Sequence, residues 1–295
     1  MGRLDGRVAI VTGAGRGIGA GIASLFAAEG ALVVVNDLGV ALDGSAPDPA
    51  PARDVAGAIN AAGGRAVANG ADVADHEAAA GLVRQAVDEF GKLDVLVNAA
   101  GILRDRMVFN MTPEEWDAVI RVHLRGTFNT TRHAAAYWRE QQNPNASYRL
   151  INFTSVSGLH GSPGQPNYAA AKMGIVGLTY SCANALARYG VTSNAISPVA
   201  STRMTASIPD DRRRSASDVD ERAPANVAPM VVYVASDRSG WLNGQVIGAG
   251  GYRVSLYNRP QVLHQVDSDG PWDVERLFAT VERDLRPALE QPSRA

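Results

Sequence analysis

Short apolar runs rich in β-branched residues alternate along most of the chain with stretches of helical pattern. The runs predict seven strands, at residues 8–12, 32–36, 66–69, 95–98, 149–154, 193–197 and 245–248. Helical patterns fill the gaps, one ending near residue 30 and the clearest others covering residues 75–90, 113–139, 166–188 and 226–236. Strands that are apolar on both faces and alternate with helices are typical of a parallel sheet with helices on each side. With right-handed crossovers, the chain predicts an α/β fold, a doubly wound parallel sheet of the Rossmann type.

Two internal segments depart from this rhythm. Residues 39–53 are rich in Gly, Pro and Ala and predict an irregular insertion. Residues 199–225 form a polar loop that contains Arg212, Arg213 and Arg214. These three guanidinium groups could contact substrate phosphates, or they could lie in solvent among the neighbouring Asp residues.

The C-terminal stretch also lacks the strand–helix alternation. From residue 255 onward only one element is expected, an amphipathic helix near residues 274–285. The sequence shows neither a second domain nor an internal repeat. We therefore expect one domain at residues 1–254, with residues 255–295 as an irregular C-terminal extension of it.

A glycine-rich turn joins the first predicted strand to the helix that follows. Residues 12–19 read Thr-Gly-Ala-Gly-Arg-Gly-Ile-Gly. Such a turn lets the backbone approach a pyrophosphate, and the N–H groups and positive dipole end of the helix favour that anion. An ordinary tight turn is the alternative, but the position between a strand and a helix favours a nucleotide site. We expect the site to include Gly13, Arg16, Gly17, Ile18 and Gly19.

Asp37 ends the second predicted strand. Its carboxylate can accept hydrogen bonds from the ribose hydroxyls of a nucleotide and would repel a 2′-phosphate, which favours NAD over NADP. An Asp can also simply cap a strand, and Arg16 could still hold a phosphate. Other candidates lie at the carboxyl ends of the third and fourth predicted strands, where open α/β sheets bind ligands. They are Asp72, Val73, Asn98, Ala99 and Gly101.

Tyr168 and Lys172 are the strongest candidates for chemistry. Four residues apart on a helical stretch, they share one helix face, and an ammonium beside a phenol lowers the pKa of the phenol. Ser155, just past the fifth predicted strand, could polarise a substrate oxygen. A surface pair is the alternative, but of 28 basic residues only Lys92 and Lys172 are lysines. Because nearly all the other basic residues are Arg, a Lys at position 172 indicates a need for its compact ammonium group.

Taken together, these motifs resemble the short-chain dehydrogenase/reductase family over roughly residues 4–254. Residues 12–19, Asn98-Ala-Ala-Gly101, Ser155, the Tyr168–Lys172 pair and Pro198 follow the order of that family. The resemblance implies that Tyr168 exchanges the hydroxyl proton and Ser155 positions the oxygen. It also implies that Lys172 binds the nicotinamide ribose and that Asn98, Pro198 and Thr202 belong to the cofactor site.

A narrower resemblance rests on residues 33–39, 101–106 and 122–128. These stretches are similar to the (3R)-hydroxyacyl-CoA dehydrogenase part of the peroxisomal multifunctional enzymes, also described as type 4 hydroxysteroid dehydrogenases. The resemblance implies an NAD-dependent oxidoreductase that interconverts a secondary alcohol and a ketone on an acyl-CoA or steroid-like small molecule. His123 stands where most of the family has an Asn of the proton relay, and we count it among the catalytic candidates.

Two other functions stay open at this point. A 3-oxoacyl-carrier-protein reductase shares the scaffold, but Asp37 argues against it because reductive biosynthesis usually uses NADPH. A non-catalytic NAD-binding sensor or scaffold is disfavoured by the intact Ser155, Tyr168 and Lys172. By analogy with the family, we expect a homodimer or homotetramer that pairs the helices at residues 113–139 and 166–188.

Composition excludes several classes. A net charge of −2 gives no basic field for nucleic acid, and no apolar run approaches the ~20 residues of a membrane span. The single cysteine, Cys182, allows no internal disulfide, and no residue cluster has metal-ligand spacing. Without a recognisable leader, the expected location is cytoplasmic.

Overall fold

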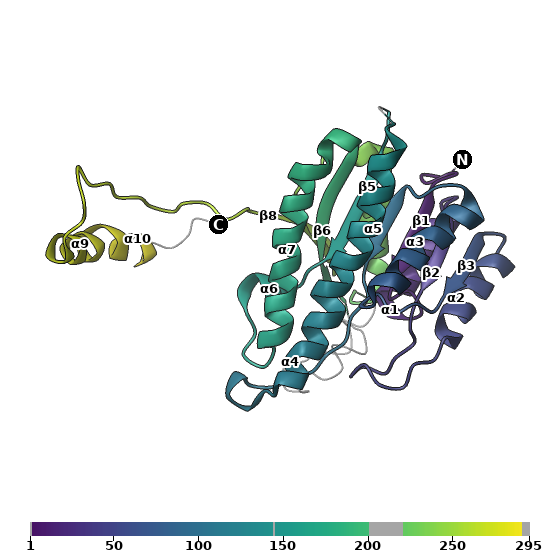
Figure 1. Ribbon diagram of the computed structural model, residues 1–295, viewed down its shortest axis with the longest axis horizontal. Coiled ribbons are helices and arrows are strands. Elements are labelled where there is room, and N and C mark those ends of the chain that lie inside the picture. The colour runs from purple at the N-terminus through teal and green to yellow at the C-terminus, as the bar shows by residue number, and fades with distance from the viewer. Residues whose placement is uncertain (1, 144, 201–220, 291–295) are drawn as a thin grey trace. The chain divides into compact units, whose positions relative to one another are not determined.

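A computed structural model describes residues 2–143, 145–200 and 221–290, and its core is one eight-stranded sheet (Figure 1). The strand order is β3-β2-β1-β4-β5-β6-β7-β8. The strands are β1 (Val8–Thr12), β2 (Leu32–Asn36), β3 (Arg65–Asn69), β4 (Val95–Asn98), β5 (Tyr148–Phe153), β6 (Val191–Val199), β7 (Val246–Gly250) and β8 (Arg253–Tyr257). Strands β1 to β7 are parallel, so the predicted α/β fold is confirmed.

Strand order reverses at β1, which pairs with β2 on one side and β4 on the other. The register sets Thr12 opposite both Asn36 and Asn98. The loops that begin after Thr12, Asn36 and Asn98 therefore leave the sheet at the same edge, next to one another. This reversal is the switch point at which open α/β sheets bind their ligands.

Helices cover both faces of the sheet. One layer contains α1 (Gly17–Ala28), α2 (Ala50–Ala61) and α8 (Ala228–Ala235), which pack on Ala9, Val11 and their neighbours. The other contains α3 (His76–Phe90), α5 (Gly126–Gln141) and α7 (Pro166–Leu186), which lie side by side in Figure 1. Val8 and Ile10 face this second layer. Alternate side chains of one apolar strand are thus buried on opposite faces.

Four features differ from the predicted elements. Helix α2 begins at Ala50, inside the stretch 39–53 that was predicted to be irregular. A helix can begin there because proline is tolerated in the first turn, where Pro51 lies, and because Ala52 is buried. The pattern at 113–139 is two helices, α4 (Pro113–Ile120) and α5, joined by the π-helical turn η2 (Arg121–Arg125). A short helix, α6 (Val156–His160), was not predicted, and neither was the antiparallel edge strand β8.

Residues 258–295 form a compact unit separate from residues 1–257. This second unit contains α9 (Val274–Thr280), the π-helical turn η9 (Val281–Leu285) and α10 (Arg286–Glu290). A helix was predicted near residues 274–285, and the side chain of Asp273 caps its first turn. Residues 255–257, which the sequence assigned to the extension, complete β8.

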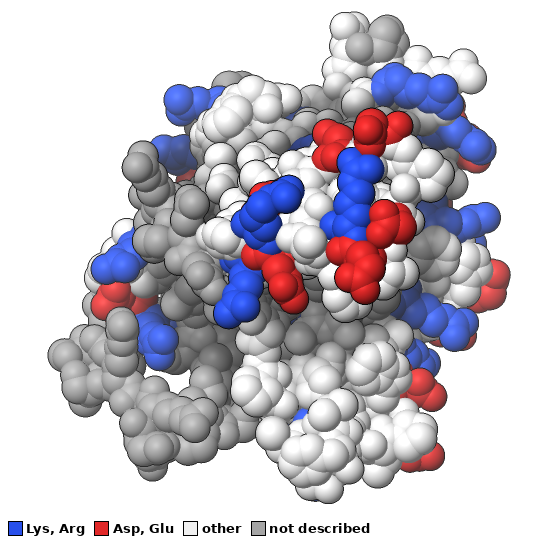
Figure 2. Space-filling model, turned by 90° about the vertical axis from the view of Figure 1, so that its left-hand side faces the viewer, with Lys and Arg blue, Asp and Glu red and all other residues white. Residues whose placement is uncertain are grey.

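Short 3-10 turns complete the described chain: η1 (Val108–Asn110), η3 (Ala187–Tyr189), η7 (Pro224–Asn226) and η8 (Asp237–Ser239). None of the helices in the described ranges is long and apolar enough to cross a membrane. Within the second unit, which is nearest the viewer in Figure 2, acidic and basic side chains lie next to one another rather than in a field of one sign.

Candidate active site

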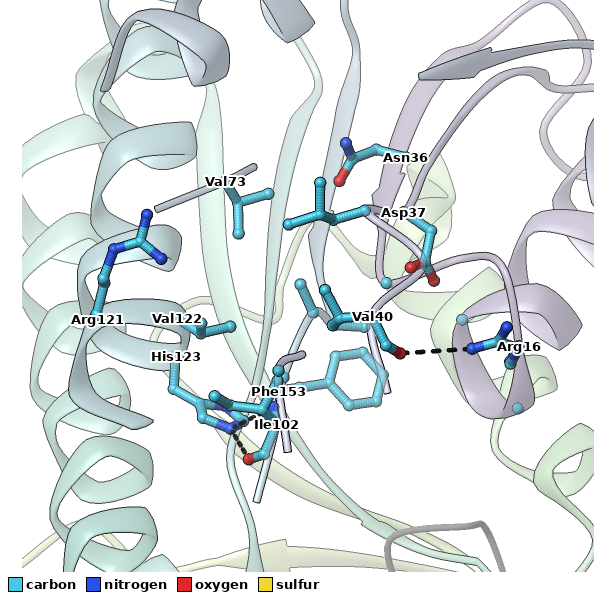
Figure 3. A pocket seen from close by; sticks show the side chains of 18 of the residues that line it. Arg16, Asn36, Asp37, Val40, Val73, Ile102, Arg121, Val122, His123 and Phe153 are labelled. Atoms are coloured by element: carbon cyan, nitrogen blue, oxygen red, sulfur yellow. Dashed lines mark hydrogen bonds between the residues drawn. The ribbon is translucent and has the colours of Figure 1, made fainter. Parts of the chain in front are cut away.

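A cleft of about 470 Å³ opens at the carboxyl ends of the central strands. It is the place that the switch point predicts. Figure 3 shows Arg121, Val122 and His123 on one side of it and Asn36, Asp37 and Arg16 on the other. The predicted site residues that line the cleft are Gly13, Arg16, Gly17, Ile18, Gly19, Asp37, Asp72, Val73, Ala99, Gly101, His123, Tyr168, Lys172 and Pro198.

The glycine turn lies so close to its surroundings that side chains would not fit. A Cβ on Gly19 would lie 2.2 Å from the Gly13 carbonyl oxygen. Gly13 has a φ of +65°, and a Cβ there would lie 2.7 Å from Ala100 Cα. No described side chain caps the first turn of α1, so its N–H groups are available to an anion. These features fit the pyrophosphate of a dinucleotide.

Asp37 is held by backbone groups on both sides. Its Oδ2 accepts a hydrogen bond from Gly15 N at 2.8 Å, and its Oδ1 accepts one from Gly39 N at 2.6 Å. A carboxylate has about four acceptor positions, so each oxygen retains a lone pair for a ribose hydroxyl. The two bonds fix the carboxylate at the rim of the cleft without using up its acceptor capacity.

The carboxylate of Asp72, farther along the cleft, is already paired. Its Oδ2 lies 2.6 Å from Arg121 Nη2, and its Oδ1 accepts from Ala74 N at 2.9 Å. The pair joins the end of β3 to the π-helical turn. Both ions are partly exposed, so the pair adds little stability but orients two cleft residues.

Asn98 does not line the cleft, although the resemblance implied that it would. Its amide donates to Asn152 Oδ1 at 3.0 Å and its carbonyl accepts from Thr130 Oγ1 at 2.7 Å, both within the core. The cleft wall is formed instead by the backbone that follows, at Ala99, Ala100 and Gly101. Asn98 thus acts by anchoring the turn rather than by facing a ligand.

The π-helical turn η2 places His123 inside the protein. The His123 Nε2 atom lies 2.8 Å from the Ile102 carbonyl and 3.2 Å from its N–H. Its ring meets the Tyr168 ring edge-on, with centroids 5.0 Å apart. A Cβ on Gly101 would lie 2.2 Å from His123 Cε1, so this close packing requires glycine.

Burial keeps His123 neutral. Desolvation, helped by the nearby Lys172, lowers its pKa from 6.5 to about 3. Its Nδ1 atom is buried and has no hydrogen-bond partner among the described residues. His123 therefore offers the cleft a neutral imidazole rather than a cation.

Ser155, Tyr168 and Lys172, the predicted catalytic group, lie near one another. Ser155 caps α6, its Oγ accepting from Ser157 N at 3.2 Å, and it forms a hydrogen bond with Tyr168. Helix α7 carries the other two, and the Lys172 Nζ atom lies 5.5 Å from the Tyr168 ring centroid. The same Nζ donates to the Phe153 carbonyl at 2.7 Å. The C-terminal end of β5 therefore fixes Lys172.

The expected lowering of the Tyr168 pKa by Lys172 is wrong for this structure. Burial raises the pKa of Tyr168 to about 12, and the Ser155 hydrogen bond opposes this only in part. Burial also lowers the pKa of Lys172 to about 7. Lys172 donates to a carbonyl and carries less charge than an exposed lysine near neutral pH, so it does not favour the phenolate enough to offset desolvation.

The family model for short chain dehydrogenases matches residues 7–213, across the glycine turn and the Tyr168–Lys172 pair. The chain belongs to the short-chain dehydrogenase family. Its members are oxidoreductases that bind a nicotinamide dinucleotide, and the glycine turn and Asp37, which line the cleft, are residues that fit such a group.

Three relatives of this short-chain dehydrogenase extend the comparison. It is 45% identical to the hydroxyacyl-CoA dehydrogenase ChsB1 of Mycobacterium tuberculosis, over 94% of this chain and 88% of that protein. It is 43% identical to the peroxisomal multifunctional enzyme type 2 of Mus musculus, over 80% of this chain and 30% of that protein. The crystal structure of a short chain dehydrogenase from Mycobacterium avium matches with a TM-score of 0.86 and 47% identity, over 99% and 98% of the two chains.

Two predicted groups fall outside the described residues of this dehydrogenase: Thr202 and the run Arg212–Arg214. Several residues that line the cleft were not predicted. They include Val40, Asp43, Gly44, Ile102, Arg104 and Thr154. Three of them belong to the segment 39–53, for which the Gly-, Pro- and Ala-rich composition was the sequence signal. Among the described residues, no group of three or more His, Cys, Asp or Glu side chains is placed to hold a metal ion.

Proposed function

We propose that this short-chain dehydrogenase oxidises the secondary alcohol of a (3R)-hydroxyacyl-CoA thioester, or of a similar steroid-like molecule, with NAD as cofactor. The observation that carries the proposal is one cleft that joins Tyr168 to the glycine turn and to Asp37. The relatives named as hydroxyacyl-CoA dehydrogenase and multifunctional enzyme support the substrate class.

Tyr168 is the acid/base of the proposed reaction. The substrate hydroxyl gives its proton to the Tyr168 phenolate, the carbinol C–H bond breaks with loss of hydride, and the carbonyl forms. When bound, oxidised nicotinamide supplies the hydride acceptor and a positive charge, which favours the phenolate that burial disfavours. Ser155 holds the reacting oxygen through the hydroxyl that already bonds Tyr168.

The remaining residues bind and orient. Lys172, fixed by the Phe153 carbonyl, would hold the nicotinamide ribose with its other N–H donors. His123 packs against Tyr168 and keeps the ring in place as a neutral neighbour. In this proposal the glycine turn and Arg16 hold the pyrophosphate, while Val73, Ala99, Gly101 and Pro198 form the walls.

The cofactor prediction rests on Asp37. A lost ribose hydrogen bond and the repulsion of a 2′-phosphate together make NADP at least about tenfold less efficient than NAD. Steady-state kcat/KM with each dinucleotide, measured with a (3R)-hydroxyacyl-CoA thioester, tests the ratio. Asp37→Ala should narrow the preference, while Asp54→Ala, an exposed carboxylate on α2, should leave it unchanged. Equal efficiencies in the unaltered enzyme would point instead to the reductase alternative.

A further inference from the structure

The segment between β2 and α2 is a compact loop with closed ends. We call residues 39–47 the β2–α2 loop. Asp48 N donates to the Leu38 carbonyl at 3.1 Å, so the residues that flank the loop are hydrogen-bonded to each other. Inside it, Ala41 N donates to Ser45 O at 2.8 Å. A loop of this size with adjoining ends is an Ω-loop, which packs as a unit.

The β2–α2 loop reaches the opposite side of the cleft, the segment that follows β4. Leu103 N donates to the Leu42 carbonyl at 3.0 Å. Asp43 Oδ2 lies 4.0 Å from Arg104 Nη1. Beside these contacts, Val40 packs in the same apolar cluster as Ile102 and Tyr168. The loop therefore contacts the catalytic side of the cleft, although it begins at the nucleotide side.

The loop also forms hydrogen bonds on the side of the cleft that contains the glycine turn. Arg16 Nη1 donates to the Val40 carbonyl at 3.5 Å, a bond that is drawn across the pocket in Figure 3. Gly39 N donates to Asp37 Oδ1 at 2.6 Å. The loop is thus joined to the glycine turn, to the Asp37 carboxylate and to the segment after β4.

The same loop lines the cleft that the glycine turn lines, through Val40, Asp43 and Gly44. A ligand held between the glycine turn and Asp37 shares this space with the loop. We propose that the β2–α2 loop is a gate that must open before the dinucleotide can enter or leave. This inference rests on the proposed function only in taking the cleft as the cofactor site.

Several described contacts close the gate. On the far side they include one backbone hydrogen bond, the Asp43–Arg104 pair at 4.0 Å and the packing of Val40 and Gly44 against Ile102. Partly exposed ion pairs of this kind are weak. The loop can therefore open as a unit without unfolding β2 or α2, as lids over active sites do.

The decisive variant replaces residues 39–47 with Gly-Gly. Two residues between Leu38 and Asp48 form a β-turn, and its closing bond is the Asp48 N to Leu38 O bond already present. NADH binding is followed by stopped-flow fluorescence. We expect the association and dissociation rate constants both to rise at least about tenfold, because a gate slows both directions. An unchanged association rate constant would overturn the proposal, since a loop that only contacts the cofactor changes dissociation alone.

Point variants keep the test valid if the shortened chain does not fold. Asp43→Ala, Arg104→Ala and the double variant should each raise both rate constants, about two- to fivefold and to the same extent, because they remove one contact. Asp54→Ala and Arg53→Ala are charge-matched controls on the exposed side of α2. Rate constants equal to those of the controls would contradict the gate. If the unaltered enzyme binds NADPH but not NADH, the cofactor proposal fails, and the same rates measured with NADPH still decide the gate.

Discussion

Lys172 is buried where a lysine is costly, and this has a measurable consequence. Burial lowers its pKa from 10.5 to about 7. Between those values the unfolded chain binds a proton that the folded chain does not, so the free energy of unfolding rises with pH across this window. Below pH 7 the full cost of burying the ammonium is present. Lys172 therefore reduces the stability of the folded protein near neutral pH.

Lys172→Met should therefore stabilise the cofactor-free protein near pH 7 and flatten the rise in melting temperature between pH 7 and pH 10. Met fills a similar volume and has no charge to desolvate. Thermal denaturation of both proteins across this range tests the prediction. Parallel curves would show that Lys172 is not the group that titrates.

Close packing against the His123 ring requires glycine at position 101. A methyl group there would lie 2.2 Å from the His123 ring, which is clasped by Ile102 and cannot easily move. We expect Gly101→Ala to destabilise the protein by about 1–3 kcal/mol in chemical denaturation. Adding His123→Ala should recover part of the loss by making room. Gly57→Ala, on α2 with open space around it, should be neutral or stabilising.

The sequence predicts which residues are candidates for the site better than it predicts their pKa values and contacts. Spacing and residue type were enough to select Ser155, Tyr168, Lys172 and Asp37 as candidates. The direction of the Tyr168 pKa shift could not be predicted, because it depends on desolvation by segments distant in sequence. The clasp of His123 by Ile102 likewise joins positions 21 residues apart. Polar residues inside apolar runs, such as Asn98, signal a buried network, but not which way the side chain points.

Among the elements, the π-helical turn η2 matters most for the site. It interrupts a stretch that reads as one continuous helix and turns His123 inward. Burial lowers the pKa of His123 to about 3. Between about pH 3 and 6.5, the unfolded chain therefore binds a proton at His123 that the folded chain does not bind. Stability from this residue is complete above pH 6.5 and is lost as the pH falls.

His123→Gln should reduce this acid sensitivity. Glutamine keeps a polar side chain but does not titrate, so the difference in unfolding free energy between the variant and the unaltered protein should shift in favour of the variant as the pH falls from 6.5 to 4. Urea denaturation at each pH measures that difference. A difference that is constant with pH would mean that His123 binds a proton as readily in the folded state as in the unfolded state.

Strand prediction was most accurate where β-branched residues are dense. The ends of β1, β2 and β4 agree with the predicted runs because each run is apolar and bounded by turn residues. Helix α2 was missed because its first turn contains Pro51 within a Gly- and Pro-rich stretch. Edge strand β8 has exposed side chains on both faces and so lacks a burial pattern.

For the whole molecule, the homo-oligomer and the cytoplasmic location stay predictions. Helices α5 and α7, which were predicted to pair across two-fold axes, expose Phe128 and Met173. Light scattering at micromolar concentration should give the mass of a dimer or tetramer. Phe128→Arg with Met173→Arg should lower that mass, whereas Trp241→Arg, at an exposed position outside both helices, should not. A monomeric mass for the unaltered protein would contradict the prediction.

The central claim is that Tyr168 transfers the proton in an NAD-dependent oxidation. The most direct test is the initial rate of NADH formation from a (3R)-hydroxyacyl-CoA thioester by the unaltered enzyme and by Tyr168→Phe. Tyr252→Phe, at an exposed tyrosine outside the cleft, is the control. We predict a fall of at least about 10²–10⁴-fold for Tyr168→Phe, with NADH binding retained, and no change for the control. A Tyr168→Phe rate within a few-fold of the unaltered enzyme would show that the proton is transferred by another group.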